Sequence, residues 1–192
     1  MFFLTKPSNE RIRQAINSWR KAPFNYAEAG QSLGPTPAGY ADNHARIKLG
    51  NGEAVFNKAV ETLRSWKMFD LDWASVCWPD APIEVGTTVA VLASHFGFWS
   101  LHPARIVFLV DDDDGRMRRS GFAYGTLQGH GEQGEETFII EWHHADDSVW
   151  YDLRSFSRPG ELLTTFGHPV VRRLQKRFAR ESIQAMLKAV NS

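Results

Sequence analysis

The feature that most constrains the fold is a series of short strand-like segments between residues 71 and 155, with no helical segment among them. Apolar and polar residues alternate within these segments, and glycine, proline or aspartate separates them. Parallel neighbours would need a connection of roughly a dozen residues or more. The sequence therefore predicts an antiparallel meander with strands at Leu71–Val76, Thr87–Phe96, Ala104–Asp111, Arg119–Gln128, Glu135–Trp142 and Ser148–Ser155.

Three elements are predicted ahead of the meander. A helix begins after the capping residue Ser8, carries apolar residues at helical spacing, and ends near Pro23. Alternation predicts a strand over His44–Leu49, and helical spacing returns over Glu53–Lys67. Within the meander, we expect Gly97 and Pro103 to separate the second strand from the third.

The chain after Pro159 is predicted to be mostly helical. A short segment with Leu162, Leu163 and Phe166 is interrupted at Gly167–Pro169, and a long helix then covers Val170–Val190. The residues of this helix expected to face the sheet are Val171, Leu174, Phe178, Ala185 and Ala189. Because a long twisted sheet curls and an amphipathic helix can cover its concave face, the predicted fold class is α+β. One domain over residues 1–192 has a curved antiparallel sheet of about six to seven strands that grips the C-terminal helix.

Charge and cysteine content limit the function classes. The chain has 22 basic and 22 acidic residues, so no overall field favours nucleic acid, and no nucleic-acid partner is expected. Cys77 is the single cysteine, and the first residues do not resemble a secretory signal, so a cytoplasmic location is expected. No apolar run reaches the length of about 18 residues that a membrane span needs.

One glycine-rich segment, Gly125–Glu136, contains the candidate catalytic residues. His130 with Glu135 or Glu136 could form an acid/base pair of a cyclase-type or hydrolase-type enzyme. The alternative is a hairpin whose charged residues face water. The spacing matches no compact metal motif, so neither a metal nor a cofactor is expected.

A basic stripe follows one side of the C-terminal helix. It consists of Arg172, Arg173, Lys176, Arg177 and Arg180. Such a stripe is typical of the solvated face of an amphipathic helix, and it could alternatively bind a phosphate-bearing partner in an interaction protein.

Four segments resemble those of one known protein family: Phe122–Glu141, Val149–Pro159, Asn43–Gly52 and Trp66–Trp73. The chain is similar over nearly its whole length to the uncharacterised protein family 0548, also described as domain of unknown function 1990. In its order of elements it is also similar to the Bet v 1/START-like superfamily of helix-grip domains. That likeness implies an apolar or lipid-like ligand held under the C-terminal helix.

We therefore expect a small-molecule binding domain with a hydrophobic cavity between the sheet and the C-terminal helix. Aromatic residues make up 12% of the chain, and many lie along the meander. The residues expected to line the cavity are Phe108, Phe122, Tyr124, Phe138, Ile140, Trp150 and Phe178. Since side chains alternate between the two faces of a strand, only part of this set can point inward.

Overall fold

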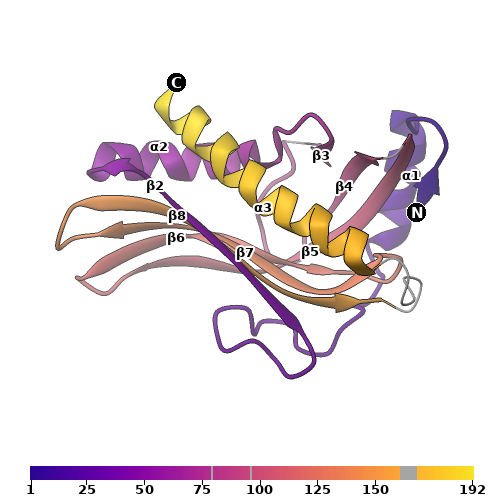
Figure 1. Cartoon of the computed structure of the whole chain (residues 1–192), viewed down its shortest axis with the longest axis horizontal. Coiled ribbons are helices and arrows are strands. Elements are labelled where there is room, and N and C mark those ends of the chain that lie inside the picture. The colour runs from indigo at the N-terminus through magenta and orange to yellow at the C-terminus, as the bar shows by residue number, and fades with distance from the viewer. Residues whose placement is uncertain (79, 96, 161–167) are drawn as a thin grey trace.

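The computed structural model describes residues 1–78, 80–95, 97–160 and 168–192 (Figure 1). Its helices are α1 (Asn9–Trp19), α2 (Glu53–Arg64), the short 3-10 helix η1 (Lys67–Phe69) and α3 (His168–Asn191). Its strands are β1 (Phe2–Phe3), β2 (Ala41–Asn51), β3 (Ala74–Cys77), β4 (Thr88–His95), β5 (Phe98–Asp113), β6 (Met117–Thr126), β7 (Glu132–His143) and β8 (Ser148–Pro159).

All of these strands belong to one antiparallel sheet, which confirms the predicted meander. Its order is β2-β8-β7-β6-β5-β4-β3, so each strand from β3 to β8 pairs with its sequence neighbour, and β1 adds to β5. β2 lies at one end of this order and pairs with β8 over Ala41–Asn51. The sheet curls into a half-barrel, and α3 crosses one face of it, as the α+β prediction expected (Figure 1).

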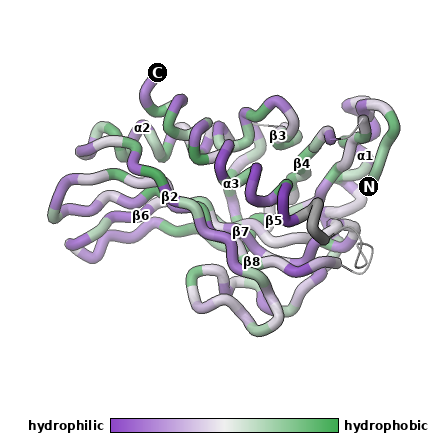
Figure 2. The backbone as a smooth tube through the Cα atoms, in the orientation of Figure 1, coloured by the Kyte–Doolittle hydropathy of each residue, from purple (hydrophilic) through white to green (hydrophobic). Residues whose placement is uncertain are grey.

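The two faces of the sheet are covered by different elements. The face toward α2 and α3 holds the larger core, where Phe122, Phe138 and Tyr151 are at most 1% exposed. On the opposite face, α1 packs Ile12 and Ile16 against the β3–β5 part of the sheet. Because apolar residues must alternate with polar ones on a strand with unlike faces, hydropathy changes repeatedly along the strands in Figure 2.

Gly97 lies between β4 and β5, as expected, but Pro103 lies inside β5, so the break expected there is wrong. β5 begins at Phe98, and Pro103 pairs with Ala90 of β4. The Pro103 carbonyl accepts a hydrogen bond from the Leu127 N–H at 3.2 Å, and the Leu127 carbonyl accepts from the His130 N–H at 3.0 Å. Proline has no N–H to donate to Leu127 in return. The position therefore tolerates proline and leaves the Leu127 carbonyl for the turn that contains His130.

The second helix ends earlier than the predicted Lys67, at Arg64. Trp66 has a φ of 55°, a left-handed conformation that an α-helix cannot continue. Its ring is buried at 2% exposure, and its Nε1–H donates to the Ala81 carbonyl at 3.1 Å. The chain then forms η1 and brings Phe69 to α3, where the rings of Phe69 and Phe178 lie 4.9 Å apart.

The long C-terminal helix is confirmed, and Leu174 and Phe178 face the cavity as predicted, but the fully buried residues of the described helix are different ones. The buried residues are Ala179, Ser182, Met186 and Val190. Ala185 and Ala189 are only partly buried. Ser182 shares a hydrogen bond of 3.2 Å with the buried Tyr151 hydroxyl, which needs a polar partner inside the core. The segment expected around Leu162–Phe166 and the side chain of Val171 lie outside the described residues.

Candidate functional site

A cavity of about 420 Å³ lies between the sheet and the first half of α3. Such a volume is within the range of small-molecule sites, about 300 to 1,000 Å³. Its apolar wall includes Phe69, Trp73, Ala74, Val91, Ala93, Leu174 and Phe178. Its polar wall includes Tyr124, Thr126, His102, His130, Glu132, Glu136, Ser155, Ser157 and Gln175. The predicted location of a cavity, under the C-terminal helix, therefore matches the space that the structure contains.

Strand alternation explains which residues reach the cavity. On β7, Phe138 and Ile140 belong to the core beneath α2 and α3, so Glu136 and Glu132 point to the same side of the strand. Gly134 lies between these two glutamates and presents no side chain. The carboxyls of Glu132 and Glu136 therefore both reach the cavity space.

Glu136 and Tyr124 form the central polar pair of the cavity. They are direct neighbours across β6 and β7, and the Tyr124 hydroxyl donates to Glu136 Oε2 at 2.8 Å. Burial raises the pKa of Glu136 to about 8, the negative charge of Glu132 adds to this, and the Tyr124 hydrogen bond opposes it. Burial and the neighbouring Glu136 charge also raise the pKa of Tyr124 well above its ordinary value. At neutral pH the pair is therefore mostly uncharged.

Glu132 connects β7 to α3. The Gln175 side-chain Nε2–H donates to Glu132 Oε1 at 2.6 Å and to Ser157 Oγ at 2.6 Å. Burial raises the pKa of Glu132 to about 7, while the Gln175 hydrogen bond and the Arg172 charge lower it. Glu132 can consequently gain or lose a proton near neutral pH.

Two histidines, His102 and His130, belong to the polar wall of the cavity. The His102 and His130 ring centroids are 5.0 Å apart. Burial lowers the pKa of His130 to about 4, and it also lowers the pKa of His102, as does the nearby His130. His130 Nδ1 lies 2.9 Å from the Glu132 backbone nitrogen and 3.2 Å from the Glu132 carbonyl oxygen, so the Glu132 backbone holds the ring in place.

The structure separates the three predicted catalytic residues. His130 and Glu136 both line the cavity. Glu135 also contributes atoms to its wall, but its carboxylate is held on the opposite face of β7. There it accepts hydrogen bonds from the Tyr26 hydroxyl at 2.7 Å, the Gly30 N–H at 2.7 Å, and the N–H and hydroxyl of Ser32. Glu135 thus fixes the loop that precedes β2.

Of the seven residues expected to line the cavity, Tyr124 and Phe178 do so. Phe122, Phe138 and Ile140 face the same side but are filled core positions at 0–1% exposure. Trp150 lies on the other face, where the Arg46 guanidinium stacks over its ring at 4.5 Å. That placement follows from alternation, since Tyr151 and Leu153 point inward.

Phe108 is turned away from the cavity by a β-bulge. Ile106 pairs with Tyr124, but Phe108 pairs with Ala123, so Val107 is an extra residue in β5. Phe108 consequently shares the face of Ala123 and not that of Tyr124. The extra residue leaves no signal in the sequence alternation, which explains why this prediction failed.

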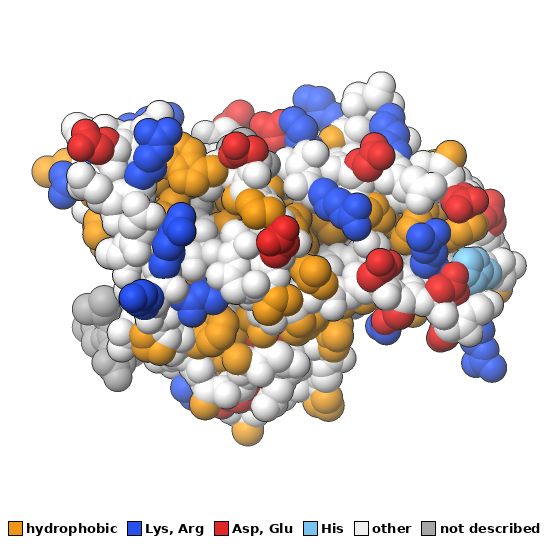
Figure 3. Space-filling view, turned by 180° about the vertical axis from the view of Figure 1, so that it is seen from behind, with side chains coloured by type: hydrophobic (Ala, Val, Ile, Leu, Met, Phe, Trp, Pro, Cys, Tyr) orange, Lys and Arg blue, Asp and Glu red, His pale blue; other side chains and the backbone are white. Residues whose placement is uncertain are grey.

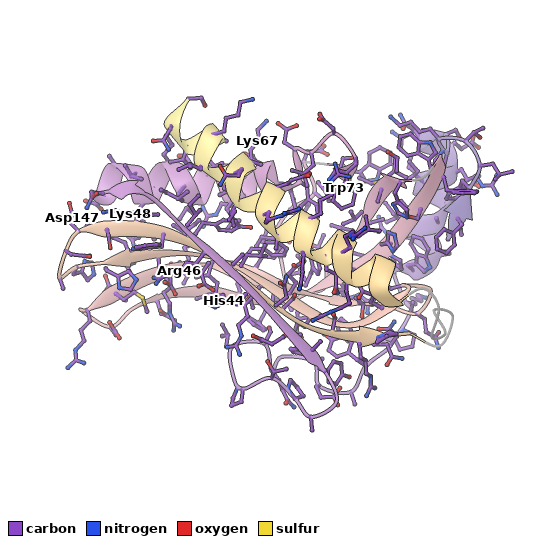
Figure 4. All side chains as sticks on the ribbon, in the orientation of Figure 1. His44, Arg46, Lys48, Lys67, Trp73 and Asp147 are labelled. Atoms are coloured by element: carbon purple, nitrogen blue, oxygen red, sulfur yellow. The ribbon has the colours of Figure 1, made fainter. Side chains whose placement is uncertain are left out.

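Sequence reasoning missed several cavity residues, namely Phe69, Trp73, His102 and Glu132. Trp73 lies beside α3 in Figure 4 and donates its Nε1–H to Glu181 Oε2 at 2.6 Å. The Arg177 guanidinium lies 4.8 Å from the Trp73 ring centroid. The signal for Phe69 and Trp73 was present in the Trp66–Trp73 segment, and Glu132 belongs to the glycine-rich segment.

The family model described as Domain of unknown function (DUF1990) matches residues 25–185. The chain belongs to this family. A UPF0548 protein of Dictyostelium discoideum is 40% identical over an aligned length of 210, and the alignment covers 100% of this chain and 97% of the relative. A UPF0548 protein of Arabidopsis thaliana is 35% identical over 208 residues, which cover 100% of both.

The fold of this DUF1990 protein is the Bet v 1-like helix-grip fold. The crystal structure of Ara h 8.0201 matches it with a TM-score of 0.50 and 14% sequence identity, covering 79% of this chain and 98% of that one. The likeness concerns the fold. Both resemblances predicted from the sequence are thereby confirmed.

The glycine-rich segment of the DUF1990 chain, Gly125–Glu136, forms a large part of the polar wall. Thr126, His130, Glu132 and Glu136 belong to it and line the cavity. In the described part of the chain, no group of three or more His, Cys, Asp or Glu side chains is arranged to hold a metal ion. The functional groups of the polar wall are hydroxyls, imidazoles, carboxyls and side-chain amides.

The predicted basic stripe of α3 is divided between solvent and protein contacts. Arg173, Lys176 and Arg180 are exposed, and the first half of α3 is mostly hydrophilic in Figure 2. Arg177 pairs with Glu181 at 2.7 Å. On the face seen in Figure 3, side chains of both signs are interspersed. Among the described residues, no helix combines the length and apolar character of a membrane span.

Proposed function

We propose that this protein binds a small, largely apolar molecule in the cavity between the sheet and α3. The observation that carries the proposal is an interior space of about 420 Å³, bounded by rings on one side and hydrogen-bonding side chains on the other. Ligand sites commonly combine apolar walls with a few convergent polar groups. Phe69, Trp73 and Phe178 supply apolar contact, and Tyr124, Glu136 and Gln175 supply orientation.

Small residues on β3 and β4 maintain the space. Ala74 and Ala93 pair directly across the two strands, and both line the cavity at 3% and 5% exposure. Alanine is a poor strand former that offers little side chain for packing. At these positions its small size leaves room for a ligand.

The test is a cavity-filling substitution. We expect Ala93→Leu to fold, since the added atoms project into empty space, and to lower affinity for any ligand of the cavity by about tenfold or more. Ligands are first identified by native mass spectrometry and thermal shift with a panel of fatty acids, sterols and aromatic alcohols and amines. Ala145→Leu, in the exposed β7–β8 turn, is the matched control. Unchanged affinity in Ala93→Leu, or no retained compound in the panel, contradicts the proposal.

A second candidate function, favoured by the Glu136–Tyr124 pair, is acid/base catalysis on the bound molecule. A carboxyl whose pKa is raised to about 8 can donate a proton at neutral pH, and Glu132 with a pKa of about 7 can accept one. The candidate enzyme of the cyclase or hydrolase kind then uses Glu136 and His130, and not Glu135. The test is an assay for turnover of the bound ligand. Glu136→Gln should abolish the turnover while ligand binding persists.

A further inference from the structure

The cavity wall is acidic, and no lysine or arginine is among its described lining residues. Glu132 and Glu136 direct their carboxyls into the cavity beside three histidines, and the charge of Arg172 acts on Glu132. Outside the cavity the same chain pairs its carboxylates with cations: Glu141 binds Arg46, and Asp152 binds His44 and Arg46. His44 and Arg46 follow one another along β2 in Figure 4. Among the described residues, the cavity therefore differs from the outer face in that Glu136 has no cation beside it.

Within the described part of the chain, Glu136 is the cavity carboxyl that has an unused oxygen and no neighbouring cation. Among the described residues, its Oε2 accepts from Tyr124 at 2.8 Å, and its Oε1 accepts no hydrogen bond. Glu135 has its carboxylate fully engaged by the Tyr26–Ser32 loop, and Glu132 is bound by Gln175. A hydrogen-bond donor on a ligand could therefore bind Glu136 Oε1.

Aromatic rings surround the approach to Glu136. The Phe69 and Tyr124 ring centroids are 6.3 Å apart, and Phe69 stacks near Phe178 at 4.9 Å. The faces of aromatic rings attract organic cations, and the attraction is stronger when water is excluded. Rings beside an uncompensated carboxyl favour a molecule with a positive charge on an apolar body.

We propose that the ligand is an apolar amine whose protonated nitrogen binds the Glu136 carboxylate, with its body against Phe69, Trp73 and Phe178. The inference rests on the proposed function and specifies its ligand class. An ammonium group donates to Glu136 Oε1 while Tyr124 continues to donate to Oε2. The ion pair forms in a setting of low polarity, where opposite charges attract strongly.

Amine binding is expected to release a proton, because the empty cavity keeps Glu136 mostly protonated at neutral pH. The affinity for an amine should then rise about tenfold for each unit by which the pH increases, up to about pH 8. A neutral ligand that accepts the Glu136 proton would show the opposite trend. The other titratable or charged groups around the site are Glu132, Tyr124, Tyr151, His95, His102, His130, Arg172, Arg177 and Glu181.

The experiment compares two probes of matched size, phenylbutylamine and phenylbutanol, by calorimetry at pH 6, 7 and 8 in two buffers of different ionisation enthalpy. We expect the amine to bind at least about tenfold more tightly than the alcohol at pH 8, with proton release at pH 7. Glu136→Gln should remove this preference and keep the alcohol affinity. Glu141→Gln, on the outer face of the same strand, should retain the preference.

The outcomes separate this inference from the proposed function. If both probes bind equally and Glu136→Gln changes neither, the amine inference is wrong and the ligand-binding proposal stands. An amine affinity that falls from pH 6 to pH 8 also overturns the inference. If neither probe binds while Ala93→Leu weakens another ligand of the panel, the inference alone fails.

Discussion

Two adjacent glutamates of β7 have opposite environments. Glu135 faces the outer side and accepts hydrogen bonds from Tyr26, Gly30 and Ser32, at 2% exposure. Glu136 faces the cavity and accepts from Tyr124. A one-residue step along a strand changes the face, so Glu135 serves the structure of a loop while Glu136 stays available to a ligand.

At Glu135 we predict a large loss of stability without loss of ligand binding. Glu135→Gln presents an amide N–H₂ to at least one of the donors from Tyr26, Gly30 and Ser32, which leaves buried groups unsatisfied. The free energy of unfolding, measured by urea denaturation, should fall by about 2 kcal/mol. The Tyr26–Glu135 bond is also the contact that ties the loop to β7.

The matched control for this prediction is Glu141→Gln on the same face of β7. Glu141 forms a partly exposed ion pair with Arg46, and such pairs contribute about 0 to 1 kcal/mol. A Glu135→Gln variant as stable as Glu141→Gln would show that the loop is held by other contacts.

At the scale of the element, α3 is attached to the rest of the molecule by a few specific contacts. Trp73 donates to Glu181, Gln175 bridges Glu132 and Ser157, and Ser182 meets Tyr151. The first half of the helix covers the cavity, whereas Met186 and Val190 are buried in the core. The proposed ligand would therefore lie beneath the part of α3 that polar contacts hold.

We predict that Trp73→Phe loosens the first half of α3. The substitution removes the indole N–H that donates to Glu181 and reduces the surface under Arg177. Amide hydrogen exchange of residues 172–182 should become faster, and global stability should fall by about 1 kcal/mol.

The control is Trp150→Phe, which also removes an indole hydrogen bond, here to Ser148 Oγ at 2.8 Å, on the outer face. It should leave exchange in α3 unchanged. Equal exchange in both variants would mean that Trp73 does not hold the helix.

At the scale of the whole molecule, the buried carboxyls of the cavity make stability depend on pH. Glu136 and Glu132 have pKa values of about 8 and about 7 in the folded chain, against an ordinary value of 4.5. Between pH 4.5 and 8 the folded chain therefore holds protons that the unfolded chain has released. Their contribution to stability is fully present below pH 4.5 and is lost as the pH rises through 7 and 8.

We accordingly predict that the free energy of unfolding falls by about 2 kcal/mol between pH 6.5 and pH 8, measured by urea denaturation. His130, whose pKa is lowered to about 4, acts in the opposite direction, but only between pH 4 and its ordinary value of 6.5. Glu136→Gln should remove most of the decrease. Stability that is constant or rises over this window contradicts the assignment of Glu136 as a buried carboxyl.

Much of the fold could be predicted because its signals are local. Turn residues and a two-residue period identified the meander from β3 to β8, and helical spacing identified α1, α2 and α3. Two positions were nevertheless predicted incorrectly. Pro103 lies inside β5, where its carbonyl accepts a hydrogen bond from the Leu127 N–H, and α2 ends before Trp66, whose ring is buried in the core. The candidate site was located in the correct segment, Gly125–Glu136, but only part of its residues was named correctly.

The sequence by itself determined the order of elements, their antiparallel pairing and the polar composition of one strand pair, because these depend on neighbours within a few residues. Only the tertiary structure decided that β2 joins β8, that the bulge at Val107 turns Phe108 outward, and that Glu136 rather than Glu135 reaches open space. Those outcomes depend on how distant segments pack, since the register between strands and the volume left beneath a helix are set by contacts across the whole sheet.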